Sequence, residues 1–213
     1  MPPVEVLIAF TIASLVLNLS PGPSNLYVMA RSISQGMKGG MVASLGLATG
    51  SLLHVFAAVL GLSALFQHSP ALYTAVKLIG AAYLIYLGIR YWRSSDPSRI
   101  DASRSVPQKS WSAIFRESVI VEATNPKTAL FFIALLPQFV VPEAGPVWLQ
   151  LLLLGAIVTV SALPCDFAVA LFSSRLAGWL NRHRQAQRIQ QRFSGSLLLG
   201  IGAFLIVEEA RAR

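Results

Sequence analysis

The chain has 213 residues, of which 54% are hydrophobic and only 12% are charged. Soluble domains of this size carry about twice that share of charged residues, so the composition excludes an ordinary soluble protein and predicts a polytopic membrane protein. The formal net charge of +8 does not indicate nucleic-acid binding, because the basic residues gather in connecting segments with no aromatic residues alternating between them.

Apolar segments long enough to span a lipid bilayer as helices recur along the chain. A membrane helix needs about 20 predominantly apolar residues, and most of these segments reach or exceed that length. The last segment is the shortest. The expected spans are approximately Val4–Ala30, Gly40–Phe66, Ala71–Tyr91, Trp111–Phe139, Val147–Phe172 and Phe193–Val207.

The connections between these spans differ in charge. Lysine and arginine occur in the segments 31–39, 90–116 and 173–192, whereas the turns at 67–70 and 140–146 contain none. Short loops that are rich in lysine and arginine stay in the cytoplasm. Six helices with both termini on the outer side satisfy this alternation throughout.

The first expected span is interrupted by the stretch Asn18-Leu19-Ser20-Pro21-Gly22-Pro23-Ser24-Asn25. Proline removes a backbone donor and clashes with the preceding turn, so the helix has to break or kink there. Inside a bilayer, freed backbone groups are tolerated only where protein or a water-filled cavity satisfies them. We therefore expect this break to face a polar interior. The candidate substrate-binding residues are Asn18, Ser20, Pro21, Gly22, Pro23 and Asn25.

A second break of the same kind, Glu122-Ala123-Thr124-Asn125-Pro126-Lys127-Thr128, interrupts the fourth expected span. Two interrupted segments at corresponding places in two halves indicate the binding site of a transporter. Asn125, Pro126 and Lys127 are therefore further candidates for substrate binding. Three alternatives stay open: the prolines only kink the helices, the asparagines and Ser20 only bond between helices, and Lys127 only forms a structural salt bridge with Glu122 or Asp166.

A glycine stripe marks one face of the second expected span. Gly46, Gly50 and His54 are spaced four residues apart, so they share that face. A Gly-xxx-Gly pair lets the backbone of a neighbouring helix approach closely. We therefore expect a close helix crossing at Gly46 and Gly50.

A weak internal repeat relates the third and sixth expected spans. Lys77-Leu78-Ile79-Gly80 opens one and Arg192-Phe193-Ser194-Gly195 opens the other. With the paired breaks, this pattern predicts two three-helix halves, the second inverted in the membrane because three is odd. The expected fold is an all-α membrane protein of six helices in a single domain over 1–213. Its parts are repeat 1 at about 4–93, a cytoplasmic loop at about 94–110 and repeat 2 at about 111–209.

Several motifs in order along the chain resemble one family. They are Ser20-Pro21-Gly22-Pro23, then Ser32-Ile33-Ser34-Gln35-Gly36, then Gly80-Ala81-Ala82-Tyr83-Leu84, and Asn125-Pro126-Lys127-Thr128 followed by Leu136-Pro137-Gln138-Phe139. Together they resemble the LysE/RhtB family of bacterial amino-acid exporters. The resemblance implies a multi-pass protein of the bacterial inner membrane that exports amino acids in exchange for protons and is not an enzyme. Its partners would be an amino acid, protons and lipid, and assembly into a homo-oligomer is left open.

Four ionisable residues lie well inside apolar segments: His54, Glu122, Lys127 and Asp166. A charge at bilayer depth costs about 2.5 kcal/mol or more, so such residues usually face an interior cavity. The sequence has no glycine-rich loop with a Lys-Ser/Thr pair for ATP, which leaves the proton gradient as the expected energy source. We expect Asp166 to carry the proton, because a local break at Pro164 would let water reach it. Glu122 and His54 are the next candidates.

Two other functions stay open at this stage. Asp166, Glu122 and His54 could ligate a metal cation in a transporter of the same architecture, although no His, Asp or Glu cluster has metal-ligand spacing. Ser20, His54 and Asp166 supply the residue types of a catalytic triad, but a triad is recognised only by its geometry. The lone Cys165 excludes an internal disulfide. We expect no cofactor and no resident metal.

Overall fold

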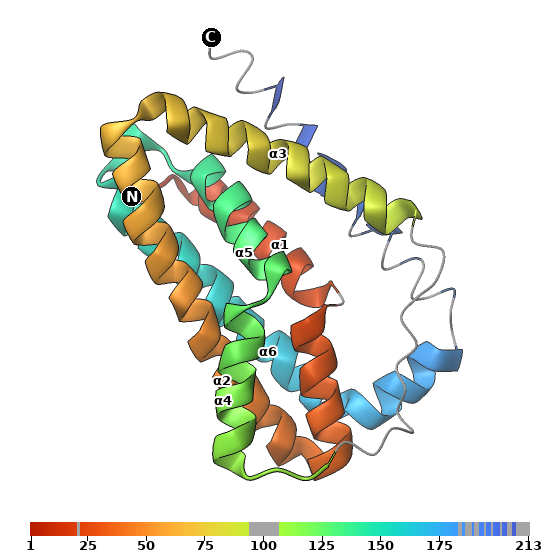
Figure 1. Ribbon diagram of the computed structural model, residues 1–213. Helices are drawn as coiled ribbons and strands as arrows, with labels where there is room; N and C mark the ends of the chain where they lie inside the picture. Colours follow the sequence, from red (N-terminus) through yellow and green to blue (C-terminus); the bar gives the residue numbers. More distant parts are fainter. Residues whose placement is uncertain are drawn as a thin grey trace.

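The computed structural model describes residues 1–20, 22–93 and 107–182, together with positions 185, 189, 192, 193, 195, 196, 198–200, 202, 203, 206 and 207. Every secondary-structure element in these ranges is helical (Figure 1), which confirms the all-α prediction. The elements are α1 (Val4–Leu19), α2 (Pro23–His68), α3 (Pro70–Arg93), α4 (Trp111–Ala123), α5 (Pro126–Leu135), the 3-10 helices η1 (Leu136–Phe139) and η2 (Pro142–Ala144), and α6 (Val147–Arg182).

Some of these helices are long and apolar enough to cross a membrane. By length and composition, α2 and the part of α6 at Val147–Ser173 each qualify as a span. The pair Trp111–Ala123 and Pro126–Phe139 qualifies together as one span that is bent by 47°. The described residues therefore contain two candidate spans, or three with the bent pair. The expected span at Phe193–Val207 lies largely outside the described residues.

The turn after the first break is shorter than predicted. We expected a connection over 31–39, but α2 continues through it and only Gln35 and Gly36 have non-helical backbone angles. Gly36 has φ 72°, a left-handed conformation that glycine adopts without strain. The chain reverses direction here (Figure 1), so α2 consists of a first arm at 23–34 and a second arm at 37–68. Two residues are enough because glycine makes so tight a reversal possible.

Helix α6 also differs from the prediction in two respects. It continues to Arg182, well beyond the expected end at Phe172. It also runs without interruption through Pro164, where we expected a local break. A proline inside a membrane helix is tolerated where neighbouring groups satisfy the freed carbonyl. Asp166 therefore lies on a continuous helix rather than beside a break.

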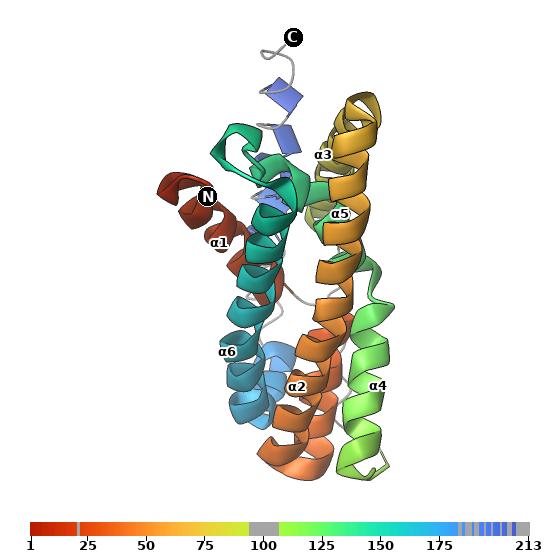
Figure 2. The same ribbon diagram turned by 90° about the vertical axis from the view of Figure 1, so that its left-hand side faces the viewer.

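Helix α2 lies between α6 and α4, as Figure 2 shows. The glycine stripe on its second arm faces α4, which confirms the predicted close approach. A Cβ atom added at Gly46 would lie 2.5 Å from the carbonyl oxygen of Phe115, and one at Gly50 would lie 2.7 Å from that of Val119. On the side of α6, Gly155 packs with similar closeness against Val55 of α2.

Two apolar clusters fill the interior. The larger cluster joins α1, the second arm of α2, α5, η1 and the first half of α6, and includes Phe10, Leu17, Val55, Phe131 and Val158. The smaller cluster joins α2, α4 and the second half of α6, and consists of Val28, Ala43, Leu47, Ile114 and Ala170.

The glycine crossing generates a stability prediction. Gly50→Ala should lower the thermal unfolding midpoint in detergent, because its Cβ would meet the Val119 carbonyl oxygen at 2.7 Å and Glu122 Cβ at 2.8 Å. Overpacking of this kind costs about 1–3 kcal/mol. Gly61→Ala is the matched control, since Gly61 lies on the same helix with nothing within 4 Å. Equal midpoints for the two variants would contradict the close crossing.

Candidate functional site

The two breaks have the same local structure, and both predicted breaks are confirmed. After α1, Ser20 and Gly22 are extended and Pro23 is the first residue of α2. After α4, Asn125 is extended and Pro126 is the first residue of α5. Proline suits the first helical position, because the N–H that it lacks would have no partner there. Pro21 lies outside the described residues.

Lys127 connects the second break to the first. Its Nζ atom donates to the carbonyl oxygens of Leu17 at 2.8 Å and Ser20 at 2.6 Å. These carbonyls belong to the C-terminal end of α1, where a cation is also favoured by the helix dipole. Gly22 leaves room for this contact, because a Cβ there would lie 3.2 Å from Lys127 Cδ.

The expected alternative for Lys127 was a salt bridge with Glu122 or Asp166. Among the described residues, the ion pairs within 4.0 Å are instead Arg31–Glu117 and Lys109–Glu117. Both carboxylates still interact with Lys127 electrostatically, without direct contact. Its ammonium group is thus held by backbone oxygens, and neither carboxylate neutralises it by direct contact.

Glu122 lies where both breaks meet, and its side chain is held by neutral donors. Its carboxylate accepts hydrogen bonds from the Ser24 hydroxyl, from Thr128 Oγ1 at 2.7 Å and from Asn125 Nδ2 at 3.4 Å. Asn125 Nδ2 also donates to Ser24 Oγ at 2.8 Å. Glu122 is only 7% exposed, so these donors replace the water that a free carboxylate would bind.

His54 contacts the backbone of Glu122. Its Nε2 atom lies 2.9 Å from the Glu122 carbonyl oxygen, and its ring lies 5.7 Å from that of Phe132. The structure therefore brings His54 to the second break, although its side chain does not line the central cavity described next.

A small cavity lies between the two breaks, α2 and α6. Its volume is about 40 Å³, which is room for a few water molecules at roughly 10–15 Å³ each. It lies between the two apolar clusters, because Leu17 and Val158 of the larger cluster and Leu47 of the smaller one all line it. We call it the central cavity. Its lining residues are Leu17, Asn18, Ser24, Asn25, Leu47, Ala48, Ser51, Glu122, Asn125, Lys127, Thr128, Val158, Ala162 and Asp166.

Asp166 enters the central cavity from α6 and differs from Glu122 in its contacts. It is 8% exposed, and its carboxylate forms no hydrogen bond or ion pair with a described residue. The charges of Glu122 and Lys127 act on it through space. A buried carboxylate without a fixed donor is available to a proton or to a cation that enters the cavity.

Two asparagines complete the polar lining near the first break. Asn18 Nδ2 donates to Ser161 Oγ at 3.1 Å and lies 3.4 Å from the Val158 carbonyl oxygen, so it ties α1 to α6. Asn25 Nδ2 donates to the Asn18 carbonyl oxygen at 3.0 Å, which bridges the break. The amide oxygens of both side chains are left as acceptors beside the cavity.

The structure gathers most of the predicted site residues. Asn18, Asn25, Asn125, Lys127, Glu122 and Asp166 line the central cavity. Ser20 and Gly22 border it through Lys127, while Pro23 and Pro126 begin the helices that follow the breaks. The prediction missed Ser24, Ser51 and Thr128, which also line it. Ser24 and Thr128 lie inside the two interrupted stretches, so their position was the available signal.

The described residues contain no group of three or more His, Cys, Asp or Glu side chains that could hold a metal ion. What they do contain is a polar, charged cavity at the meeting point of two broken helices inside an apolar helical protein. This arrangement is typical of membrane transporters.

The comparisons with known proteins agree with that class. The sequence profile of the LysE type translocators matches residues 15–209, and the chain belongs to this family. The resemblance seen in the sequence motifs is thereby confirmed, and the protein is a membrane protein of a translocator family.

Several relatives align over nearly their whole length. A protein of Salmonella typhimurium named homoserine/homoserine lactone efflux protein is 34% identical over 197 residues, which cover 92% of this chain and 94% of the relative. An uncharacterized membrane protein of Vibrio cholerae is 31% identical and covers 97% of this chain and 99% of its own. The Bacillus subtilis membrane protein YrhP is 29% identical, covering 92% of this chain and 96% of its own. No solved structure gives a significant match.

The link between the breaks can be tested at Ser24. Ser24→Ala removes both the donor to Glu122 and the acceptor for Asn125, and should destabilise the protein by about 1–3 kcal/mol because buried polar groups lose their partners. Thermal unfolding in detergent measures the loss. Ser112→Ala is the control, since that hydroxyl is exposed. If both variants unfold at the wild-type midpoint, Ser24 does not hold the breaks together.

Proposed function

We propose that this protein is a secondary active exporter of amino acids or close derivatives across the bacterial inner membrane, driven by exchange with protons. The observation that carries the proposal is the contact of Lys127 with the carbonyls of Leu17 and Ser20, beside a cavity that also contains Asp166. One cation and one unpartnered carboxylate in the same small cavity suit a ligand with both charges, which is the chemistry of an amino acid.

The family and the named relatives support this substrate class. The chain is a LysE type translocator, and its Salmonella typhimurium relative is named for the efflux of homoserine and its lactone. In the proposed binding mode, Lys127 and the amide donors beside the cavity bind the carboxylate of the substrate. Asp166 and the amide oxygens of Asn18 and Asn25 bind its ammonium group. The other predicted residues at the breaks hold this arrangement open.

The size of the cavity supports a mechanism in which the site changes shape. A volume of about 40 Å³ is well below the roughly 150 Å³ of an apolar cavity that accommodates benzene. An amino acid therefore requires movement of the lining helices before it binds. We infer that the structure represents a contracted state, with the breaks as the points where the helices move.

The proposed architecture comprises six membrane helices in one domain, arranged as two inverted repeats at about 4–93 and 111–209. The similar local structure of the two breaks, each with a proline at the first position of the next helix, supports this symmetry. The basic segments are assigned to the cytoplasm and both termini to the periplasm.

Asp166 is the proposed proton carrier. Ser24, Asn125 and Thr128 hold the Glu122 carboxylate, whereas no described residue donates to Asp166. A proton carrier has to change its contacts during the cycle, and at Asp166 no hydrogen bond to a described residue has to break for this to happen. His54 contacts a backbone carbonyl and does not line the central cavity, so it ranks below both carboxylates.

The proposed function predicts efflux of at least one amino acid. Proteoliposomes loaded with individual radiolabelled amino acids, homoserine included, should release one or more of them faster than liposomes without protein. An inward proton gradient should accelerate the release, because one pH unit is about 1.4 kcal/mol and supports about a tenfold substrate gradient for one-to-one exchange. Release of a divalent metal cation but of no amino acid would refute the proposal.

The role of Asp166 predicts a separation of exchange from coupling. Asp166→Asn should abolish accumulation driven by a pH gradient, while substrate exchange at equal pH persists at a reduced rate. Glu122→Gln is the comparison, and gradient-driven accumulation should survive in it even if protein yield falls. Initial rates in proteoliposomes with and without an imposed pH gradient measure both effects. Uphill transport by Asp166→Asn would transfer the role to Glu122.

A further inference from the structure

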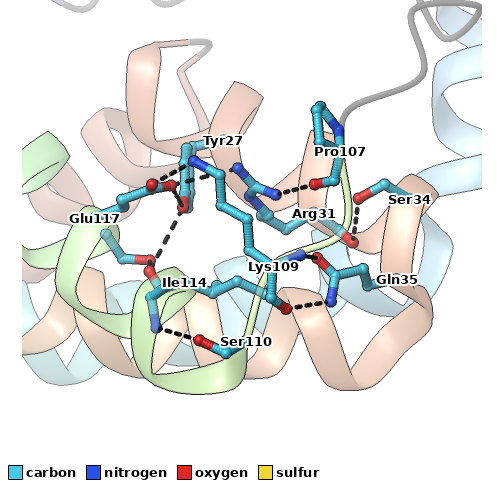
Figure 3. A network of polar contacts seen from close by, with 11 residues as sticks. Tyr27, Arg31, Ser34, Gln35, Pro107, Lys109, Ser110, Ile114 and Glu117 are labelled. Atoms are coloured by element: carbon cyan, nitrogen blue, oxygen red, sulfur yellow. Dashed lines mark hydrogen bonds and ion pairs between the residues drawn. The ribbon is translucent and has the colours of Figure 1, made fainter.

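A second polar cluster lies away from the central cavity, at the far end of α4 (Figure 3). Three of its side chains, Tyr27, Arg31 and Gln35, come from the first arm of α2 and the turn that follows it. The other contributors, Lys109 and Glu117, come from the segment before α4 and from α4 itself. We call these five residues the inner network. None of them was predicted as a functional residue.

The inner network joins the two proposed repeats through Glu117. Arg31 Nη2 lies 3.3 Å from Glu117 Oε2, Lys109 Nζ pairs with Glu117 Oε1, and the Tyr27 hydroxyl donates to Glu117 Oε2 at 2.9 Å. The Arg31 guanidinium also lies over the Tyr27 ring at 5.2 Å. A single carboxylate therefore connects two cations and a hydroxyl from separate segments.

Backbone contacts close the same junction. The Gln35 side-chain amide donates to the Lys109 carbonyl oxygen at 2.8 Å and accepts from the Lys109 N–H at 2.9 Å. Arg31 Nη1 donates to the Pro107 carbonyl oxygen at 3.1 Å. The segment that leads into α4 is thus fastened across the turn of α2.

The network lies at a consistent depth below the cavity on both helices. At about 1.5 Å per residue, Arg31 is about 9 Å along the first arm of α2 from Asn25, and Glu117 is about 7.5 Å along α4 from Glu122. Between these two layers lie Val28 of the smaller apolar cluster and Val121, which packs against that cluster. The order along this axis is central cavity, apolar cluster, inner network.

We propose that the inner network is the cytoplasmic gate of the central cavity, and that the two ion pairs of Glu117 break when substrate enters. The proposal rests on the proposed direction of export, because only an exporter must admit its substrate from the side that carries the basic segments. The described state is then closed toward the cytoplasm.

Three features make this junction suited to opening. The Glu117 side chain is 36% exposed, so water can replace its partners when the pairs separate. The turn beside Gln35 contains Gly36, which has φ 72° and nothing within 4 Å of an added Cβ, so the first arm of α2 can move there. Arg31 is buried, and its Nε atom has no hydrogen-bond partner among the described residues. The closed state therefore leaves one buried polar atom without a partner.

Locking the junction tests the gate directly. In a Cys165→Ser background, which removes the chain's one cysteine, Gln35→Cys and Lys109→Cys are joined with a short bifunctional methanethiosulfonate reagent. Amino-acid efflux should fall to the background of empty liposomes and return after reduction with dithiothreitol. Each single-cysteine variant treated in the same way should retain its efflux. Full efflux by the cross-linked double variant would overturn the proposal.

Weakening the junction provides a second test that needs no substrate. The reporter is Ala48→Cys in the central cavity, labelled by a membrane-impermeant thiol reagent in inside-out vesicles of the Cys165→Ser background. Glu117→Gln should raise the labelling rate at least about fivefold, a shift of ~1 kcal/mol at 1.4 kcal/mol per tenfold. Arg116→Gln is the control at the same depth, because Arg116 is exposed and its one hydrogen bond within the described part of the chain goes to the Ser112 carbonyl oxygen of its own helix.

The labelling result separates the gate from the proposed substrate. Faster labelling of the Glu117→Gln vesicles supports the gate even if no amino acid is transported. Equal rates for Glu117→Gln and Arg116→Gln, or an increase confined to right-side-out vesicles, would overturn it even if amino-acid efflux is observed.

Discussion

The structure depends on one constraint: helices that break inside an apolar environment leave carbonyl and N–H groups that need partners. Lys127 meets this need for α1, because its ammonium binds the carbonyls of Leu17 and Ser20. Asn125 meets it for α5, because its side chain accepts from the N–H of Lys127. Residues of the second break therefore stabilise both breaks, and the contact of Lys127 with α1 holds the two breaks together.

This solution determines how charge is distributed in the cavity. Lys127 is engaged by backbone oxygens and Glu122 by Ser24, Asn125 and Thr128, so both side chains help to hold the two breaks together. Asp166 faces the same space from α6 without a described donor. A ligand or a proton can therefore act on Asp166 without dismantling the junction, which is why the proposed coupling and the proposed structural roles separate onto different carboxylates. In the inner network, toward the other end of α4, the Glu117 carboxylate is likewise held by several partners. It is exposed enough for water to replace them.

Local signals made much of the helical layout predictable. Proline in an apolar run identified both breaks, and the spacing of Gly46 and Gly50 predicted the close approach of α4. Two predictions were wrong for a shared reason. The connection expected over 31–39 is reduced to the turn at Gln35 and Gly36, and no break occurs at Pro164, because tertiary contacts override local propensity in the flanking residues. Ser32, for example, bonds the Val28 carbonyl within the helix that we expected to have ended.

The sequence by itself determined the membrane class, the positions of both breaks and the family, because composition, proline chemistry and motif order are local properties of the chain. Only the tertiary structure decided which groups meet. It paired Lys127 with carbonyls of α1 in place of a carboxylate, surrounded Glu122 with neutral donors, and brought Glu117 to Arg31 and Lys109. These pairs lie up to 110 residues apart in the chain, so no local pattern contains them. Partner choice depends on the packing of α4 and α6 against α2, and that packing is settled only when the whole chain folds.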